Sequence, residues 1–218
     1  MSGLYGDKHR ELQDQFETRA LADRLVDVII TEEIADDAKD FIESRPMFFL
    51  STIDQNGQPT CSYKGGAPGF VKVVDSTTIA FPSYDGNGMF YSIGNMRETA
   101  KVGILFIDFE TPHRVRFHGT ATVSSDDPLM SDYQEAELIV RVKLTKMWIN
   151  CPRYIHKYEL KELSHYVPGQ KDKTPFAGWK RVDLMQDVLA PKDRGRPEQE
   201  GGVISIEEWV EDVQKGEG

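Results

Sequence analysis

Between Met47 and Ser124 the sequence repeats short β-type runs separated by turn residues, and this feature limits the fold more than any other. Met47 to Ile53 is followed by Asp54-Gln55-Asn56-Gly57, and Thr60 to Lys64 can return antiparallel because an Asn-Gly pair tolerates positive φ. Further strands are predicted at 69–74, 77–81, 101–109 and 114–124. Many short strands without strand–helix alternation must hide their sheet edges, and closing the sheet into a barrel does this. We therefore predict a mainly β fold, a small β-barrel with helices at its periphery.

Helices are predicted before, within and after this strand-rich region. Residues 11–30 have apolar residues at near-helical spacing, and a second helix is predicted at 33–43, ending before Pro46. Residues 89–100 are predicted to form a helix that crosses from one strand to the next. Near the C-terminus, Ser205 and Glu208 form a capping box at the start of a short helix whose apolar stripe contains Trp209.

The second half of the chain is less regular, and its pattern leaves alternatives open. Residues 136–149 fit a strand or a helix, and so do residues 153–160. Residues 168–175 are predicted to be a polar loop, and residues 191–202, rich in Pro, Gly and charge, a mobile linker. We expect three segments: a helical segment over 1–45, the barrel over 46–167 and a C-terminal extension over 168–218.

Charge and residue usage exclude several classes of protein. The formal net charge of −10 argues against nucleic acid or an anionic membrane as the main partner. No run approaches the roughly 18 apolar residues of a membrane span, and residues 1–10 lack an apolar signal core, so we expect a cytoplasmic protein. Neither Cys61 nor Cys151 belongs to a CxxC pair, and the histidines show no close ligand spacing. We therefore expect neither disulfides nor a metal site.

Three segments, 61–71, 81–88 and 91–95, combine glycines with hydroxyl and amide side chains. Glycine lets backbone N–H groups approach a ligand, and neutral donors suit a flat heteroaromatic ring with a ribityl-type chain. The same residues are also the commonest turn formers, so an ordinary loop explains them equally well. The chain has neither a GxxxxGK[ST] nor a GxGxxG motif, so no P-loop or Rossmann site is indicated.

The order of these segments resembles that of the pyridoxamine 5'-phosphate oxidase-like flavoproteins. The resemblance covers roughly Phe41 to Val123: the hairpin, the strand leading to Tyr84, a helix ending near Ala100, Val102 to Phe106, and Arg114 to Ala121. It implies a split β-barrel and an obligate homodimer, with FMN held in two equivalent clefts between the subunits. A small-molecule substrate is implied as well.

Individual site residues follow from this resemblance. Ser83 and Tyr84 follow the strand where the family places flavin contacts, and Arg114 matches a polar residue that reaches the flavin ring. Lys64 lies near a basic position that holds the FMN phosphate in relatives. The resemblance thus implies seven cofactor-binding residues: Lys64, Ser83, Tyr84, Asn87, Ser92, Asn95 and Arg114.

The departures from the family pattern concern activity. Ser62 stands about where the oxidase has arginine, and Tyr91 and Ser92 occupy the region of an Arg-Lys pair. The C-terminal arginine segment that clamps the substrate in true oxidases is not evident, so vitamin B6 oxidation is not expected. We expect an FMN-dependent oxidoreductase in which Arg114 stabilises the reduced ring and no catalytic side chain is identified. The alternatives are a split barrel that binds a deazaflavin or haem, and a non-catalytic flavin-binding dimer.

The phenylalanines give a separate argument for a dimer. The strand faces carry more aromatic surface than one small barrel interior easily holds; the residues are Phe48, Phe49, Phe70, Phe81, Phe106 and Phe117. A Phe-rich core is the alternative explanation.

Overall fold

The computed structural model describes residues 3–169 and 173–216. The chain divides into two compact units, Met1–Leu163 and Ser164–Gly218. The three-segment division expected from the sequence stays a prediction.

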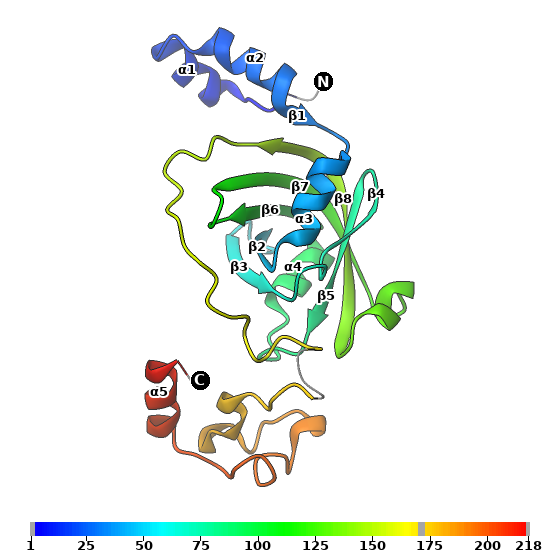
Figure 1. Cartoon of the computed structure of the whole chain (residues 1–218), viewed down its shortest axis with the longest axis vertical. Coiled ribbons are helices and arrows are strands. Elements are labelled where there is room, and N and C mark those ends of the chain that lie inside the picture. Colours follow the sequence, from blue (N-terminus) through cyan, green and yellow to red (C-terminus); the bar gives the residue numbers. More distant parts are fainter. Residues whose placement is uncertain (1–2, 170–172, 217–218) are drawn as a thin grey trace. The chain divides into compact units, whose positions relative to one another are not determined.

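The first unit is built mainly from strands, with helices at its periphery (Figure 1). Its helices are α1 (Asp7–Gln15), α2 (Arg19–Ile29), α3 (Asp36–Ser44), α4 (Tyr91–Glu98) and a short 3-10 helix, η1 (Pro128–Asp132). Its strands are β1 (Ile30–Thr31), β2 (Met47–Ile53), β3 (Pro59–Gly65), β4 (Lys72–Asp75), β5 (Thr78–Tyr84), β6 (Lys101–Asp108), β7 (His113–Ser124) and β8 (Ala136–Ile149).

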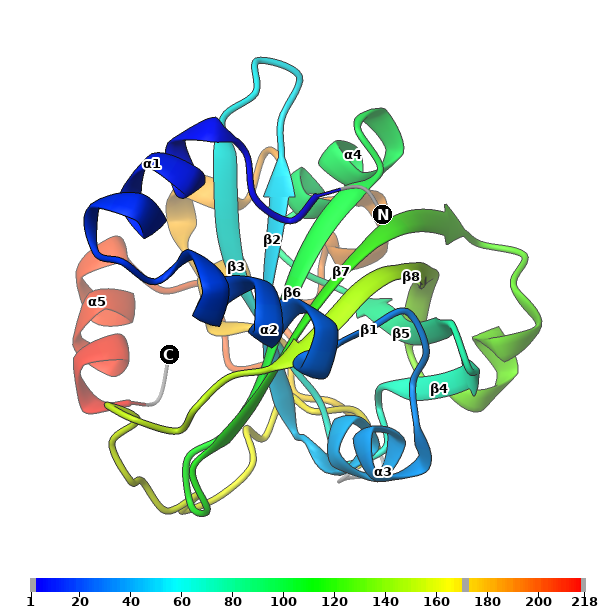
Figure 2. The same cartoon turned by 90° about the horizontal axis from the view of Figure 1, so that it is seen from above.

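These strands form one antiparallel sheet that curls around a single core (Figures 1 and 2). The strand order is β3-β2-β6-β7-β8-β5-β4, and β1 pairs with β8. β3 and β4 stand at the two ends of this order and are not paired with each other, so the barrel is split along that line. The predicted mainly β, split-barrel fold is confirmed.

The β2–β3 hairpin forms as its turn sequence predicts. One carboxylate oxygen of Asp54 accepts the backbone N–H groups of Asn56 and Gln58 at 2.9 and 2.8 Å. Gly57 has φ of 80°, a conformation that favours glycine. The strands then pair in register from Met47 opposite Gly65 to Ile53 opposite Pro59.

Alternate residues of the strands point inward and make the main core. Phe48, Phe106 and Phe117 are completely buried, and Phe48 lies within 5.7 Å of the rings of Phe70, Phe81 and Phe106. Five of the six phenylalanines that suggested a dimer therefore fill the chain's own interior, and the explanation of a Phe-rich core holds for them. The exception is Phe49, which is only partly buried and points to the opposite face of the sheet.

Two sequence predictions in this unit are wrong in their boundaries. The helix predicted at 11–30 is two helices, separated at Phe16 to Thr18, where Glu17 has φ of 55°. The apolar spacing of five between Phe16 and Leu21 exceeds a helical turn and marks the break. The strand predicted at 69–74 begins only at Lys72, because a turn precedes it: Gly69 has φ of 88°, and the backbone N–H of Phe70 donates to the Ala67 carbonyl at 2.9 Å.

The two ambiguous segments resolve differently. Residues 136–149 form β8, the longest strand, which pairs with both β5 and β7. Its Lys and Arg residues resemble a helix pattern in sequence but lie on one face of the sheet. Residues 153–160 form neither a helix nor a strand.

The second unit has little regular structure and one central ion pair. It contains the short 3-10 helices Gly178–Arg181, Asp183–Met185 and Pro191–Asp193, and the helix α5 (Ile206–Lys215). Lys180 and Asp193 are both buried and lie 2.7 Å apart. The prediction of a mobile linker over 191–202 is wrong because this segment supplies the buried carboxylate. The predicted capping box of Ser205 and Glu208 is confirmed at the start of α5.

The polar loop predicted at 168–175 lies partly outside the described residues. None of the helices in the described part of the chain is both long and apolar enough to span a membrane.

Candidate functional site

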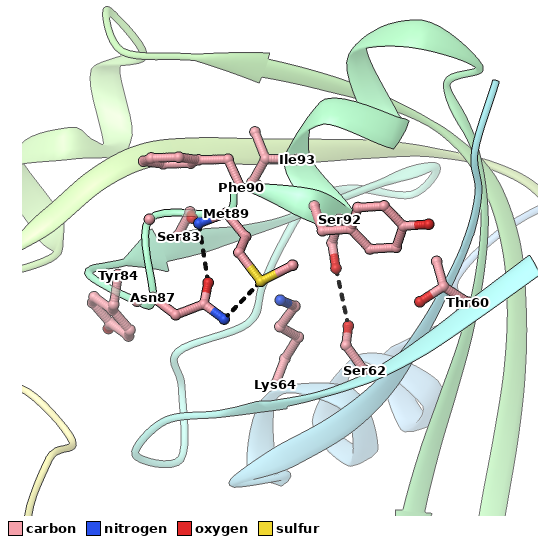
Figure 3. A pocket seen from close by; sticks show the side chains of 13 residues that line it. Thr60, Ser62, Lys64, Ser83, Tyr84, Asn87, Met89, Phe90, Ser92 and Ile93 are labelled. Atoms are coloured by element: carbon pink, nitrogen blue, oxygen red, sulfur yellow. Dashed lines mark hydrogen bonds between the residues drawn. The ribbon is translucent and has the colours of Figure 1, made fainter. Parts of the chain in front are cut away.

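A cleft of about 340 Å³ opens in the first unit between β3, the end of β5 and the start of α4 (Figure 3). Its lining is mostly hydroxyl, amide and glycine residues with a few apolar side chains. The lining residues are Thr60, Ser62, Lys64, Ser83, Tyr84, Gly86, Asn87, Gly88, Met89, Phe90, Tyr91, Ser92 and Ile93.

Lys64 is the only cation among these described lining residues, and none of them is acidic. The side chain rises from β3 into the space between Met89 and Ser62 (Figure 3). In the described part of the chain no carboxylate lies within ion-pair distance of its amine. Burial lowers the pKa of Lys64 from its usual value because a charged amine loses solvation in the cleft. An anionic ligand would stabilise the charged form of such an amine in place of the lost solvent.

The N-terminus of α4 opens onto the same cleft. Phe90, Tyr91, Ser92 and Ile93 belong to the cleft lining, and no side chain caps this end of the helix. The first N–H groups of a helix have no acceptor within it and carry partial positive charge. Phe90 has φ of 48°, a left-handed conformation that costs a bulky residue roughly 1–2 kcal/mol. The strained residue sits where the chain turns from the cleft loop into the helix.

Side-chain hydrogen bonds hold α4 against the β2–β3 hairpin. The hydroxyls of Ser62 and Ser92 lie 3.2 Å apart across the cleft floor (Figure 3). The Tyr91 hydroxyl donates to the Asp54 carboxylate at 3.5 Å. The pKa of Asp54 is held below its usual range mainly by the backbone N–H of Gln58, with the N–H of Asn56 and the Tyr91 hydroxyl also contributing. The hairpin turn therefore fixes the position of the helix start.

The opposite wall comes from the end of β5 and the loop after it. A register shift between Ser83 and Tyr84 brings both residues to the cleft at this strand end. Burial, with the nearby Glu135 carboxylate, raises the pKa of Tyr84, so its hydroxyl stays a neutral donor. Asn87 shapes the loop: its amide oxygen accepts the N–H of Met89 at 3.1 Å, and its nitrogen donates to the Met89 sulfur (Figure 3).

Five of the seven residues predicted to bind a cofactor thus line one cleft: Lys64, Ser83, Tyr84, Asn87 and Ser92. The other two lie elsewhere. Asn95 is buried and donates to the Thr52 hydroxyl at 3.1 Å, which ties α4 to β2. Arg114 donates to the backbone oxygen of Cys151 at 3.0 Å. Val115 pairs in one row with Phe106, Phe48 and Lys64, whose side chains point to the inner face of the sheet. Adjacent residues of a strand point to opposite faces, so Arg114 stands on the outer face.

Three lining residues, Thr60, Met89 and Phe90, fall outside the segments singled out from the sequence. Thr60 could have been found, because Thr60, Ser62 and Lys64 alternate along β3 and so share one face. Phe90 carried no such signal, since a left-handed backbone at a bulky residue follows from tertiary structure. Among the described residues no three His, Cys, Asp or Glu side chains gather closely enough to hold a metal ion.

Comparison with known proteins gives a family and several structural likenesses. Residues 34–148 match the family model of pyridoxamine 5'-phosphate oxidase. No curated protein matches the chain.

Among solved structures, the chain is similar to a putative pyridoxamine 5'-phosphate oxidase from Lactobacillus delbrueckii, with 20% identity, 54% of this chain and 95% of that one covered, and a TM-score of 0.45. It is also similar to an FMN-binding protein from Syntrophomonas wolfei (12% identity, 67% and 98% covered, TM-score 0.37). A third likeness is to HutZ, a haem storage protein from Vibrio cholerae (17% identity, 53% and 94% covered, TM-score 0.40). We assign no ligand from likenesses this distant.

Proposed function

The chain belongs to the pyridoxamine 5'-phosphate oxidase family, and from this premise we propose that it is an FMN-binding flavoprotein and an FMN-dependent oxidoreductase. The family match covers residues 34–148, and every residue that lines the cleft lies within this range.

One observation carries this proposal: Lys64, which has no carboxylate partner among the described residues, faces the uncapped N-terminus of α4 across the cleft. A helix N-terminus with converging N–H groups favours a phosphate, and a partly buried cation beside it adds charge. Lys64, the N–H groups at the start of α4, and the hydroxyls of Ser62 and Ser92 would hold the phosphate of FMN. These groups fit a phosphate because no acidic lining residue opposes it.

The charge balance has a consequence for affinity. A phosphomonoester carries about −1.5 to −2 charges at neutral pH, and the described cleft offers one side-chain cation. The rest of the charge must be met by neutral hydroxyl and backbone donors and by the helix end. Lys64 therefore carries a larger share of phosphate binding than it would beside a second cation.

The remaining lining suits a flat ring with polar edges. Ser83, Tyr84 and Asn87 offer neutral hydrogen bonds, while Met89 and Phe90 offer apolar contact. No histidine or cysteine lies among the described lining residues, so the side chains that most often bind haem iron are missing from this cleft. The lining chemistry therefore favours a flavin over haem. A deazaflavin remains the alternative for the experiment below.

We further propose that the protein is a homodimer with a cofactor at each subunit interface. The cleft volume of about 340 Å³ is at the lower end for sites that enclose a ligand of this size. Met89, Phe90 and Tyr91 are each about half exposed or more at its mouth. A second copy would cover these side chains and the open face of the ring. If Arg114 contacts the flavin, this geometry requires the cleft of the other copy.

When bound, FMN supplies the hydride and electron chemistry. The chain's own residues would orient it. Lys64, the two serines and the start of α4 would hold the phosphate end, and Tyr84 and Asn87 would contact the ring from the end of β5 and the loop after it. The cleft mouth leaves room for a small-molecule substrate, and no lining residue is assigned a catalytic role.

The absorbance spectrum of the purified full chain tests the cofactor. We expect flavin bands, release of FMN on heating, and about one FMN bound per chain on titration. A Soret band, or protein that quenches no FMN fluorescence, would overturn the proposal. FMN-loaded protein should then oxidise reduced nicotinamide in the presence of an acceptor, and failure with every acceptor tested would argue for the non-catalytic flavin-binding dimer.

A further inference from the structure

The two N-terminal helices contain no buried residue. α1 has 9 residues and α2 has 11, and they pack against each other (Figures 1 and 2). Isolated helices shorter than about 12–15 residues are marginal in water, and most of their stability in proteins comes from packing an apolar face. This helical hairpin therefore lacks the contact that normally stabilises helices of its length.

The two N-terminal helices and the turn between them expose five large apolar side chains. Leu21, Leu25 and Val28 share one face of α2 at spacings of four and three, and are 59%, 42% and 69% exposed. Leu12 and Phe16, four residues apart, are 56% and 67% exposed. We call these five residues the N-terminal apolar face. Soluble monomers rarely expose apolar patches larger than a few hundred Å², and larger ones mark interaction surfaces.

A second apolar surface lies on the outer face of the sheet. One row of paired residues crosses the strands: Ile30, Trp148, Arg116, Leu105, Phe49 and Tyr63. Tyr63 is 62% exposed at the end of this row, and Phe49 beside it is only partly buried. The N-terminal helical hairpin of α1 and α2 joins the sheet at Ile30, which is the other end of the same row. At that end Trp148 is already buried within the chain, so the open part of this face lies around Phe49 and Tyr63.

The N-terminal helical hairpin and the outer face of the sheet carry opposite charges. Between Asp7 and Ile29, six acidic residues face four basic ones. The outward positions of β6 and β7, both fully described, carry Lys101, Arg114, Arg116 and His118 and no acidic residue. Helices that lie on membranes are rich in Lys and Arg on their polar face, so the acidic hairpin favours a protein surface.

We propose that the N-terminal hairpin is an arm that packs on the outer sheet face of a second copy of this chain. This inference rests on the homodimer of the proposed function and names the elements that form it. A twofold arrangement covers both surfaces of both copies at once.

The oligomeric state of matched variants of the full chain tests this inference. Leu21→Asp places a charge on the apolar face, and Ala20→Asp places the same charge one residue away on the polar side of α2. By sedimentation, we expect dimers for the natural chain and for Ala20→Asp, and a dimer dissociation constant raised at least about tenfold for Leu21→Asp. Equal dissociation constants for the two variants would overturn the proposal.

A cross-linking experiment identifies the surface that receives the arm. Cys61 is exposed on the outer face of β3, and Leu25→Cys in a Cys151→Ser background adds one thiol to the arm. Oxidation should give a species of two chains that is lost when Cys61→Ser is added. A disulfide within one chain, or two-chain species that persist without Cys61, would overturn the proposal.

Two further measurements separate the possible failures. Vesicles of phosphatidylcholine and phosphatidylserine that bind the natural chain but not Leu21→Asp would assign the face to a membrane and overturn the proposal. FMN titration of the natural chain tests the cofactor without any change to the arm. A dimer sensitive to Leu21→Asp that binds no FMN supports the arm and refutes the flavin proposal, whereas an FMN-binding monomer refutes the arm.

Discussion

Two lysines in this chain are withdrawn from solvent in opposite ways. In the C-terminal unit, Lys180 is 4% exposed and forms a 2.7 Å ion pair with Asp193. In the barrel unit, Lys64 is partly buried among hydroxyl groups with no carboxylate in the cleft lining. A charge paired within its own fold contributes to structure, whereas a charge left without a partner is available to a ligand. The comparison assigns Lys180 to stability and Lys64 to binding.

The largest effect should come from breaking the internal pair. Asp193→Ala leaves the Lys180 ammonium buried without its carboxylate, which costs about 3–5 kcal/mol. We expect faster hydrogen exchange and proteolysis across residues 173–216 with FMN affinity unchanged. Asp187→Ala, which removes an exposed carboxylate of the same unit, is the control and should behave like the natural chain. Equal protection in both variants would show that the ion pair is not what stabilises this unit.

Removing Lys64 should lower FMN affinity and leave the fold stable, the reverse of the effect of Asp193→Ala. Lys64→Met deletes the cation of the cleft, and we expect FMN affinity to fall by about 2 kcal/mol, roughly thirtyfold. The free energy of unfolding should stay the same or rise, because a poorly solvated charge is removed. Lys101→Met, at an exposed strand position, controls for net charge. A loss of stability with no loss of affinity would place Lys64 among the structural residues.

Asn95 in α4 and Asn87 in the loop before it separate a structural role from a binding role in the same way. Asn95→Ala removes the buried hydrogen bond to Thr52, and we expect thermal or urea unfolding to show a loss of about 1–2 kcal/mol. Asn87→Ala, in the exposed cleft loop, should instead lower FMN affinity with little change in stability. If Asn95→Ala weakened FMN binding more than it weakened the fold, the predicted contact of Asn95 with the cofactor would be restored.

The smallest effect is a dependence on pH. FMN binding requires the charged amine of Lys64, so affinity is full below the pKa of Lys64 in the free protein and falls as pH rises through it. Because burial lowers that pKa, the decline begins at a lower pH than for an exposed lysine. The unfolded chain binds the proton more tightly, so stability without ligand rises over the same range. Titrations against Lys64→Met, which should lack this decline, isolate the effect.

The sequence predicts the parts of this fold that depend on local chemistry. Asn56 and Gly57 mark the hairpin turn, and Ser205 with Glu208 marks the start of α5. The break at Glu17 is marked only by the spacing of five between Phe16 and Leu21, and the near-helical spacing on both sides of it favours one long helix instead. β8 stayed ambiguous because its basic residues fit either a helix or a strand with one exposed face.

The candidate site was predictable to the extent that its residues follow recognisable strands. Lys64, Ser83 and Tyr84 lie at such strands, and the resemblance to the family assigns them to the cofactor; the cleft brings them together with Asn87 and Ser92. The position of Asn95 was not predictable, because its partner Thr52 lies on a strand 43 residues away. The partner of Lys180 was hidden for the same reason, in a segment whose composition is that of a linker. Long-range pairing decides which polar groups remain available.

The affinity ratio of FMN to riboflavin tests the central claim most directly, because the two ligands differ only in the phosphate. Fluorescence titration of the natural chain and of Lys64→Met with both ligands gives the coupling between the lysine and the phosphate. We predict that the natural chain binds FMN more tightly than riboflavin and that Lys64→Met loses most of this preference while its riboflavin affinity is unchanged. The same ratio in both proteins would contradict the assignment of Lys64 to the phosphate.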